Sequence, residues 1–111
     1  MKKLVWLSYD LSITGDYSNL FQWLDEHDAV ECGDCIACFK YDFKTNLKQE
    51  LQKDLKSKIK IDVKKDRLYL ISPKTDVDNR EKYFGTFLFG RRKASPWIGY
   101  AAKDSLDDDE I

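Results

Sequence analysis

Asp10 is the first residue of this chain whose type and position suit it for chemistry. It ends an apolar run, Val5-Trp-Leu-Ser-Tyr9, and a polar turn follows it. A carboxylate at the end of a buried strand can leave the core while a rigid element still holds it. Mg²⁺ and Mn²⁺ prefer such oxygen ligands and activate water for phosphodiester hydrolysis. Asp10 is therefore the candidate catalytic and metal-binding residue, and the structural alternative is a cap on the turn through the amides of Ser12 or Ile13.

The segment Gly90-Arg-Arg-Lys-Ala-Ser-Pro-Trp-Ile-Gly-Tyr100 combines three adjacent cations with two aromatic side chains. Cations neutralise phosphates, and aromatic faces stack on bases. The candidate residues for binding DNA or RNA are therefore Arg91, Arg92, Lys93, Trp97 and Tyr100. The same residue types dominate protein interfaces, so an extended arm that packs on its own domain or on a second copy is the alternative.

Three cysteines, Cys32, Cys35 and Cys38, form a C-x-x-C-x-x-C pattern, and His27 precedes it by five residues. Three thiolates and an imidazole are a tetrahedral zinc set. Residues three apart on a strand point to opposite faces, however, so Cys35 and Cys38 should not converge on one ion. We expect these cysteines to act as small apolar side chains rather than as a zinc site. His27 fits better as a favourable charge at a helix C-terminus.

Charge is unevenly distributed along the chain, although the net charge is only −1. Seven acids and no Lys or Arg lie between residues 5 and 39, whereas residues 40–67 hold ten basic side chains against five acids. Such asymmetry predicts charged partners, with simple solvation of the surface as the alternative. No apolar run approaches the ~20 residues of a membrane span, so we expect no membrane partner. The odd cysteine number and the absence of a signal-peptide pattern indicate a cytoplasmic protein.

The hydrophobic pattern predicts the elements that position these residues. Amphipathic helices are expected at residues 17–27 and 47–59, capped by Asp16 or Ser18 and by Thr45 or Asn46. Short β-prone runs occur at residues 4–9, 29–32, 35–41, 67–72 and 83–89. Pro73 should end the fourth run, and Phe87 and Phe89 should share one face of the last strand, with Leu88 on the other.

This order predicts an α+β fold, a ferredoxin-like β-α-β-β-α-β sandwich with an additional C-terminal strand or arm. We place this single domain at residues 1–103 and an acidic tail at residues 104–111. Short open sheets leave edges that need covering, which favours a homodimer.

The pattern Val5-Trp-Leu-Ser-Tyr-Asp10, followed by Gly15-Asp-Tyr-Ser-Asn-Leu20 and a short helix, resembles small ferredoxin-like proteins related to the CRISPR-associated adaptation endonuclease. The likeness covers roughly the first 75 residues. It implies a homodimer in which strand-end aspartates of two subunits hold a divalent metal, and only Asp10 carries over by position. Other members of that family are structural or bind nucleic acid without cleaving it.

The expected function is therefore a small nucleic-acid-associated protein, either a metal-dependent endonuclease or its non-catalytic relative in a defence or mobile-element system. The alternative is a protein–protein interaction module that uses the C-terminal arm and the acidic face, by which we mean the acids between Asp16 and Asp34.

Overall fold

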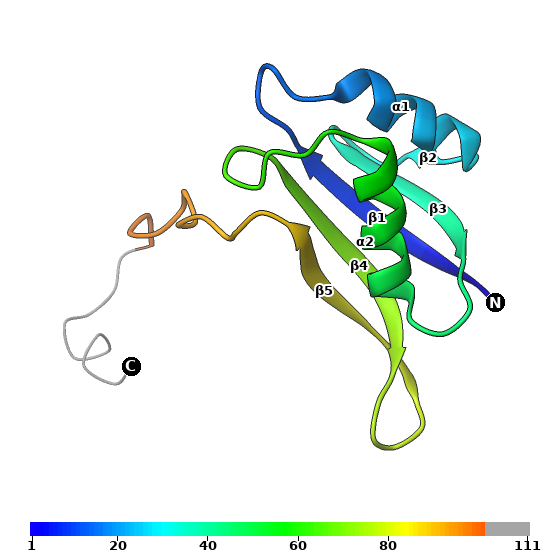
Figure 1. Ribbon diagram of the computed structural model, residues 1–111. Coiled ribbons are helices and arrows are strands. Elements are labelled where there is room, and N and C mark those ends of the chain that lie inside the picture. Colours follow the sequence, from blue (N-terminus) through cyan, green and yellow to red (C-terminus); the bar gives the residue numbers. More distant parts are fainter. Residues whose placement is uncertain (102–111) are drawn as a thin grey trace.

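The computed structural model describes residues 1–101, in which two helices lie on one face of a five-stranded antiparallel sheet (Figure 1). The elements in chain order are β1 (Lys2–Asp10), α1 (Tyr17–Glu26), β2 (Val30–Glu31), β3 (Ile36–Asp42), α2 (Leu47–Lys58), β4 (Arg67–Thr75) and β5 (Glu81–Phe89). The strand order in the sheet is β2-β3-β1-β4-β5. The α+β class and the expected order of elements are confirmed. Residues 102–103 of the expected domain, and the expected acidic tail at 104–111, lie outside the described residues.

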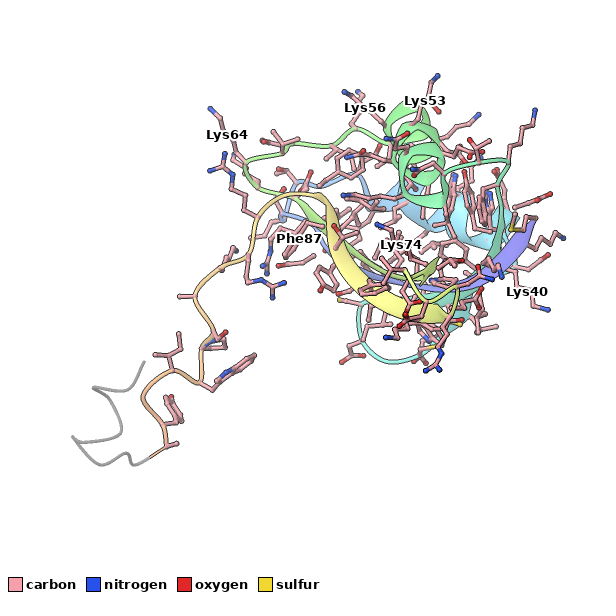
Figure 2. The ribbon with its side chains drawn as sticks, turned by 90° about the horizontal axis from the view of Figure 1, so that it is seen from below. Lys40, Lys53, Lys56, Lys64, Lys74 and Phe87 are labelled. Atoms are coloured by element: carbon pink, nitrogen blue, oxygen red, sulfur yellow. The ribbon has the colours of Figure 1, made fainter. Side chains whose placement is uncertain are left out.

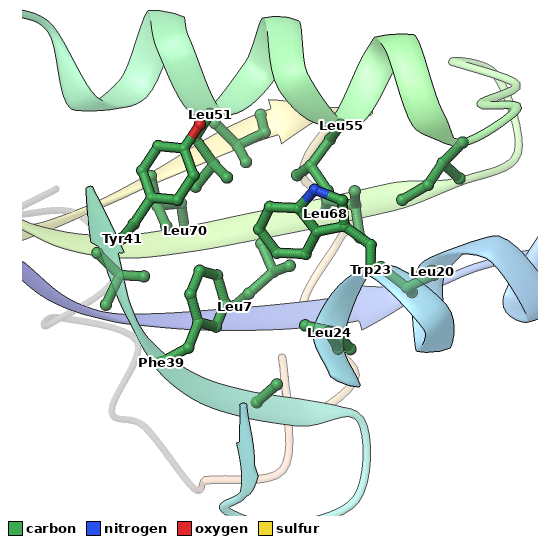
Figure 3. Close-up of a cluster of buried hydrophobic side chains, with 14 of the residues drawn as sticks. Leu7, Leu20, Trp23, Leu24, Phe39, Tyr41, Leu51, Leu55, Leu68 and Leu70 are labelled. Carbon is green, nitrogen blue, oxygen red and sulfur yellow. The ribbon is translucent and has the colours of Figure 1, made fainter. Parts of the chain in front are cut away.

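The hydrophobic core fills the space between the helices and the sheet (Figure 3). α1 buries Leu20, Trp23 and Leu24, and α2 buries Leu47, Leu51 and Leu55, as the helical spacing predicts. Alternate residues of the strands pack against these helix side chains, and they include Leu7, Phe39, Leu68 and Leu70. Neither helix is long and apolar enough to cross a membrane in the part of the chain that the structure describes.

The helix caps tie the loops to the core. Asp16 is the N-cap of α1, where its side chain accepts a hydrogen bond from the Asn19 amide. The same carboxylate accepts the Lys60 amide at 3.0 Å, which joins the start of α1 to the segment after α2. Asn46 caps α2 through the Gln49 amide. His27 is the C-cap residue of α1, and its ring stacks on Trp23 with centroids 3.7 Å apart.

Pro73 does not end the fourth strand, contrary to the sequence prediction. β4 continues to Thr75, and β5 begins at Glu81 rather than at Tyr83. β1 pairs with β4 only as far as Ile71, so within residues 1–101 one side of β4 has no strand partner beyond that point. A proline, which has no backbone N–H, is tolerated where a strand has such a free side.

The predicted facing of the last strand is also wrong. Leu88 and Phe89 are both buried, whereas Phe87 faces the opposite side of the sheet. The cause is a β-bulge: Leu68 pairs with Phe89 and Tyr69 with Phe87, which leaves Leu88 as an extra residue on β5. A bulge breaks the simple alternation of side chains, so two consecutive residues can turn toward the core.

Candidate nucleic-acid interface

Asp10 lies at the end of β1, directly opposite Arg67 at the start of β4. Two guanidinium nitrogens of Arg67 donate to one carboxylate oxygen of Asp10: Nη2 lies 2.6 Å from Oδ2 and Nε lies 3.1 Å from it. The Asp10 side chain is 57% exposed, so the pair is open to solvent. The structure thus gives Asp10 a cationic partner that the sequence analysis did not identify.

Asp66, and not Asp10, is the carboxylate that accepts a hydrogen bond from the Ser12 amide in the turn after β1. Its Oδ1 accepts the Ser12 amide at 2.8 Å and its Oδ2 accepts the Asp62 amide at 2.9 Å, while the residue is only 2% exposed. Burial raises the pKa of Asp66, but the amide donors of Asp62 and Ser12 outweigh burial and hold the pKa below its usual range. The loop after β1 and the loop before β4 are thereby joined beside the ion pair.

A cleft of about 290 Å³ opens on the face of the sheet away from the helices. Its lining residues are Ser8, Asp10, Arg67, Tyr69, Phe87 and Arg92. The Tyr69 and Phe87 rings meet edge to face with centroids 4.8 Å apart. The Arg92 guanidinium carbon lies 5.7 Å from the Tyr69 ring centre and 5.4 Å from that of Phe87. These cation–π contacts hold Arg92 at the cleft.

A larger hollow of about 630 Å³ adjoins this cleft, because Arg67 and Arg92 line both. We call its six cationic residues the basic cleft: Lys64, Lys65, Arg67, Arg91, Arg92 and Lys93. In Figure 2, Lys64 and Phe87 lie toward the end of the molecule from which the C-terminal arm leaves. Arg91, Arg92 and Lys93, which the sequence analysis selected, thus line one hollow together with Lys64, Lys65 and Arg67, which it did not select.

Gly90 makes this gathering possible. Its φ of +85° is favourable only for glycine, and an added Cβ would lie 2.6 Å from the Asp66 carbonyl oxygen and 2.7 Å from Arg67 Cγ. The chain therefore leaves β5 in close contact with the start of β4. This contact places the Arg91–Lys93 run beside the Lys64–Lys65 pair.

Trp97 and Tyr100 lie apart from these cations, on an arm that runs away from the sheet (Figure 1). Trp97 is 70% exposed and Tyr100 87% exposed. Packing of these side chains on their own domain, one of the alternatives for this segment, is therefore wrong. Two turn hydrogen bonds shape the arm, from the Ile98 amide to the Ser95 carbonyl and from the Tyr100 amide to the Trp97 carbonyl.

The candidate metal ligands do not gather into a site. Cys32 and Cys35 are exposed and Cys38 is buried. Within residues 1–101, no three His, Cys, Asp or Glu side chains are grouped as metal ligands. Asp10 is the one carboxylate among the residues described as lining the smaller cleft, and its Oδ2 already accepts two Arg67 donors. This donor set does not fit Mg²⁺ or Mn²⁺ within a single chain, because such ions need several oxygen ligands.

Comparisons of the chain with protein-family models, with curated proteins and with solved structures find no match. The resemblance to the adaptation-endonuclease family consequently stays a prediction that depends on the pattern around Asp10. The geometry of the basic cleft is the stronger guide to function.

Proposed function

We propose that this protein binds nucleic acid and that the phosphates of the nucleic acid lie in the basic cleft. The observation that carries the proposal is the convergence of six cations from two separate segments, residues 64–67 and 90–93, in one hollow. Asp10, which lines the adjoining cleft, forms an ion pair with Arg67, one of the six. A concentrated positive field of this kind is the electrostatic footprint of a phosphate-binding surface.

We also infer that the fold is ferredoxin-like. The strand order supports this classification: the helix-linked strands β1 and β2 flank β3, and the helix-linked strands β3 and β4 flank β1. β5 then extends the sheet beside β4. In this arrangement both helices occupy one face, which leaves the other face and its rim for ligands.

A direct test is the affinity for fluorescein-labelled oligonucleotides, measured by anisotropy at several salt concentrations. Lys64→Gln/Lys65→Gln should weaken binding by about tenfold and flatten the dependence of log K on log salt by about two units of slope. The matched control, Lys53→Gln/Lys56→Gln, removes the same charge from α2, on the helix side of the sheet (Figure 2). Equal effects of the two double variants, or a flat salt response of the natural chain, would contradict the proposal.

Phosphodiester cleavage is a further activity that we propose only for a homodimer. A single Asp10 supplies too few oxygen ligands, whereas two copies around a symmetry axis would supply two carboxylates. Sedimentation analysis with and without Mn²⁺ tests this idea, because metal shared between two Asp10 side chains should favour the dimer. A chain that stays monomeric at all concentrations with Mn²⁺ present would exclude the shared site.

The arm supports a protein-interaction module as the second candidate function. Trp97, Ile98 and Tyr100 are at least 70% exposed, and such side chains are common at the centre of protein interfaces. Trp97→Ala/Tyr100→Ala distinguishes the two roles. Loss of oligonucleotide binding would assign the arm to nucleic acid, whereas unchanged binding together with a shift from dimer to monomer would assign it to protein contact.

A further inference from the structure

The face of the sheet away from the helices carries a row of aromatic side chains. Side chains alternate along β1, so Val5 and Leu7 are buried beneath the helices while Trp6 lies on the opposite, open face. Trp6 meets Tyr83 of β5 edge to face, with ring centroids 5.5 Å apart. Tyr83 is 48% exposed, and nearby Ile71 is 40% exposed. In residues 1–101 both helices cover the other face (Figure 1).

Gly85 joins this pair to the basic cleft. A Cβ at position 85 would collide with the Tyr69 ring, so the end of the Tyr69 side chain lies over Gly85 of β5, between Tyr83 and Phe87. The Tyr69 ring then contacts Phe87, and Arg92 lies over both rings. We call Trp6, Tyr83, Tyr69 and Phe87 the aromatic row. It runs from the middle of the open face directly into the basic cleft.

We propose that the ligand of this surface is a single-stranded nucleic acid whose bases stack on the aromatic row while its phosphates lie in the basic cleft. This inference rests on the proposed function and narrows it. In a duplex the bases are paired and stacked on one another, so they cannot lie against side chains on a sheet. In a single strand the bases can splay out and stack on aromatic rings, and this works for any base.

The length of the aromatic row and the positive charge beside it favour a single-stranded nucleic acid over a protein as the ligand. Tyr83 and Phe87 are four residues apart on β5, about 13 Å along the strand, which exceeds the reach of one base. The aromatic row shares Tyr69 and Phe87 with the cleft that Arg67 and Arg92 line. A polyanion with flat apolar groups matches this combination of adjoining rings and cations, whereas an apolar protein surface matches only the rings.

The test compares one sequence as a labelled 12-nucleotide single strand, as DNA and as RNA, and as the corresponding duplex. The natural chain should bind a single strand at least tenfold more tightly than the duplex. Tyr83→Leu/Phe87→Leu keeps apolar side chains on the sheet but removes two stacking surfaces. It should weaken single-strand binding tenfold or more and weaken duplex binding far less, because the Tyr69 ring still holds Arg92 at the cleft. Circular dichroism melting confirms that the variant is folded.

The outcomes separate this inference from the proposed function. Duplex binding as tight as single-strand binding, with Lys64→Gln/Lys65→Gln still harmful, would overturn the stacking inference and leave the basic cleft in place. If Lys64→Gln/Lys65→Gln weakens binding of neither the single strand nor the duplex, the proposed function itself is wrong. If Tyr83→Leu/Phe87→Leu instead converts a dimer to a monomer without changing oligonucleotide affinity, the aromatic row is an interface between copies and the inference is wrong.

Discussion

Arg67 and Asp10 face each other across adjacent strands, and the guanidinium Nη2 lies 2.6 Å from the carboxylate Oδ2. Arg67 also lines both hollows of the candidate interface. Asp10 therefore holds Arg67 in place, and its negative charge lowers the positive charge around that side chain. Substitutions at Asp10 test both roles.

Asp10→Asn should tighten oligonucleotide binding by about two- to fivefold at low salt, since it removes a negative charge within reach of the phosphates. The amide oxygen still accepts from Arg67, so the position of the guanidinium is kept. Anisotropy titration measures the change, and the free energy of unfolding should change by less than about 1 kcal/mol because the ion pair is exposed. Weaker binding by the variant would mean that the full charge of Asp10 is needed to hold Arg67.

Asp10→Ala tests cleavage independently of binding. If the chain hydrolyses phosphodiesters in the presence of Mn²⁺, this variant should lose the activity while remaining folded, because the metal-binding carboxylate is gone. Gel analysis of a labelled oligonucleotide, with Asp28→Ala as an exposed acidic control on the surface, measures the effect. Undiminished cleavage by Asp10→Ala would exclude Asp10 as the catalytic residue.

Asp66→Ala should destabilise the fold by about 2–4 kcal/mol, because it removes the buried carboxylate that accepts from the Ser12 and Asp62 amides. The effect depends on pH with a defined sign. Since the pKa of Asp66 is lowered in the folded state, its contribution is fully present above the ordinary value of 3.8 and is lost as the pH falls through the folded value.

Urea unfolding at pH 7 and at pH 3 measures both effects of Asp66. The difference in stability between the natural chain and Asp66→Ala should be smaller at the acidic pH. A difference that stays constant or grows on acidification would show that the Asp66 carboxylate does not carry the contribution.

Gly90→Ala should destabilise the protein by about 2 kcal/mol or more and weaken oligonucleotide binding. The added Cβ meets backbone in a left-handed conformation, so the Arg91–Lys93 run must shift. Gly99→Ala is the matched control: its φ of +88° is nearly the same, but an added Cβ there has no heavy atom within 4 Å. Thermal melting and anisotropy should show a large effect for the first variant and a small one for the second.

Most of the fold follows from local patterns in the chain. The apolar stripe of α2, Leu47, Leu51 and Leu55, and the cap at Asn46 are signals within one turn of the helix that they specify. The cation run at residues 91–93 likewise needs no tertiary information. These features could be predicted because neighbouring residues alone decide them.

The remaining site residues depend on pairings between distant segments. Arg67 meets Asp10 only through the register of β1 and β4, and Lys64 joins the cleft only because the chain turns at Gly90. Tyr69 and Tyr83 are typical of buried strands in sequence, since aromatic residues favour both cores and strands. Their exposure is set by which face the two helices cover, and no residue near them encodes that choice.

The bulge at Leu88 determines which face of the sheet the side chains after it point to. Without the bulge, regular pairing would set Leu88 opposite Leu68 and Phe89 opposite Arg67, which would turn Phe89 out of the interior toward the open face of the sheet. The downstream cations would rotate with it and lose their alignment with Lys64 and Lys65. A single extra residue thus lets β5 place Leu88 and Phe89 in the interior directly after Phe87 on the opposite face.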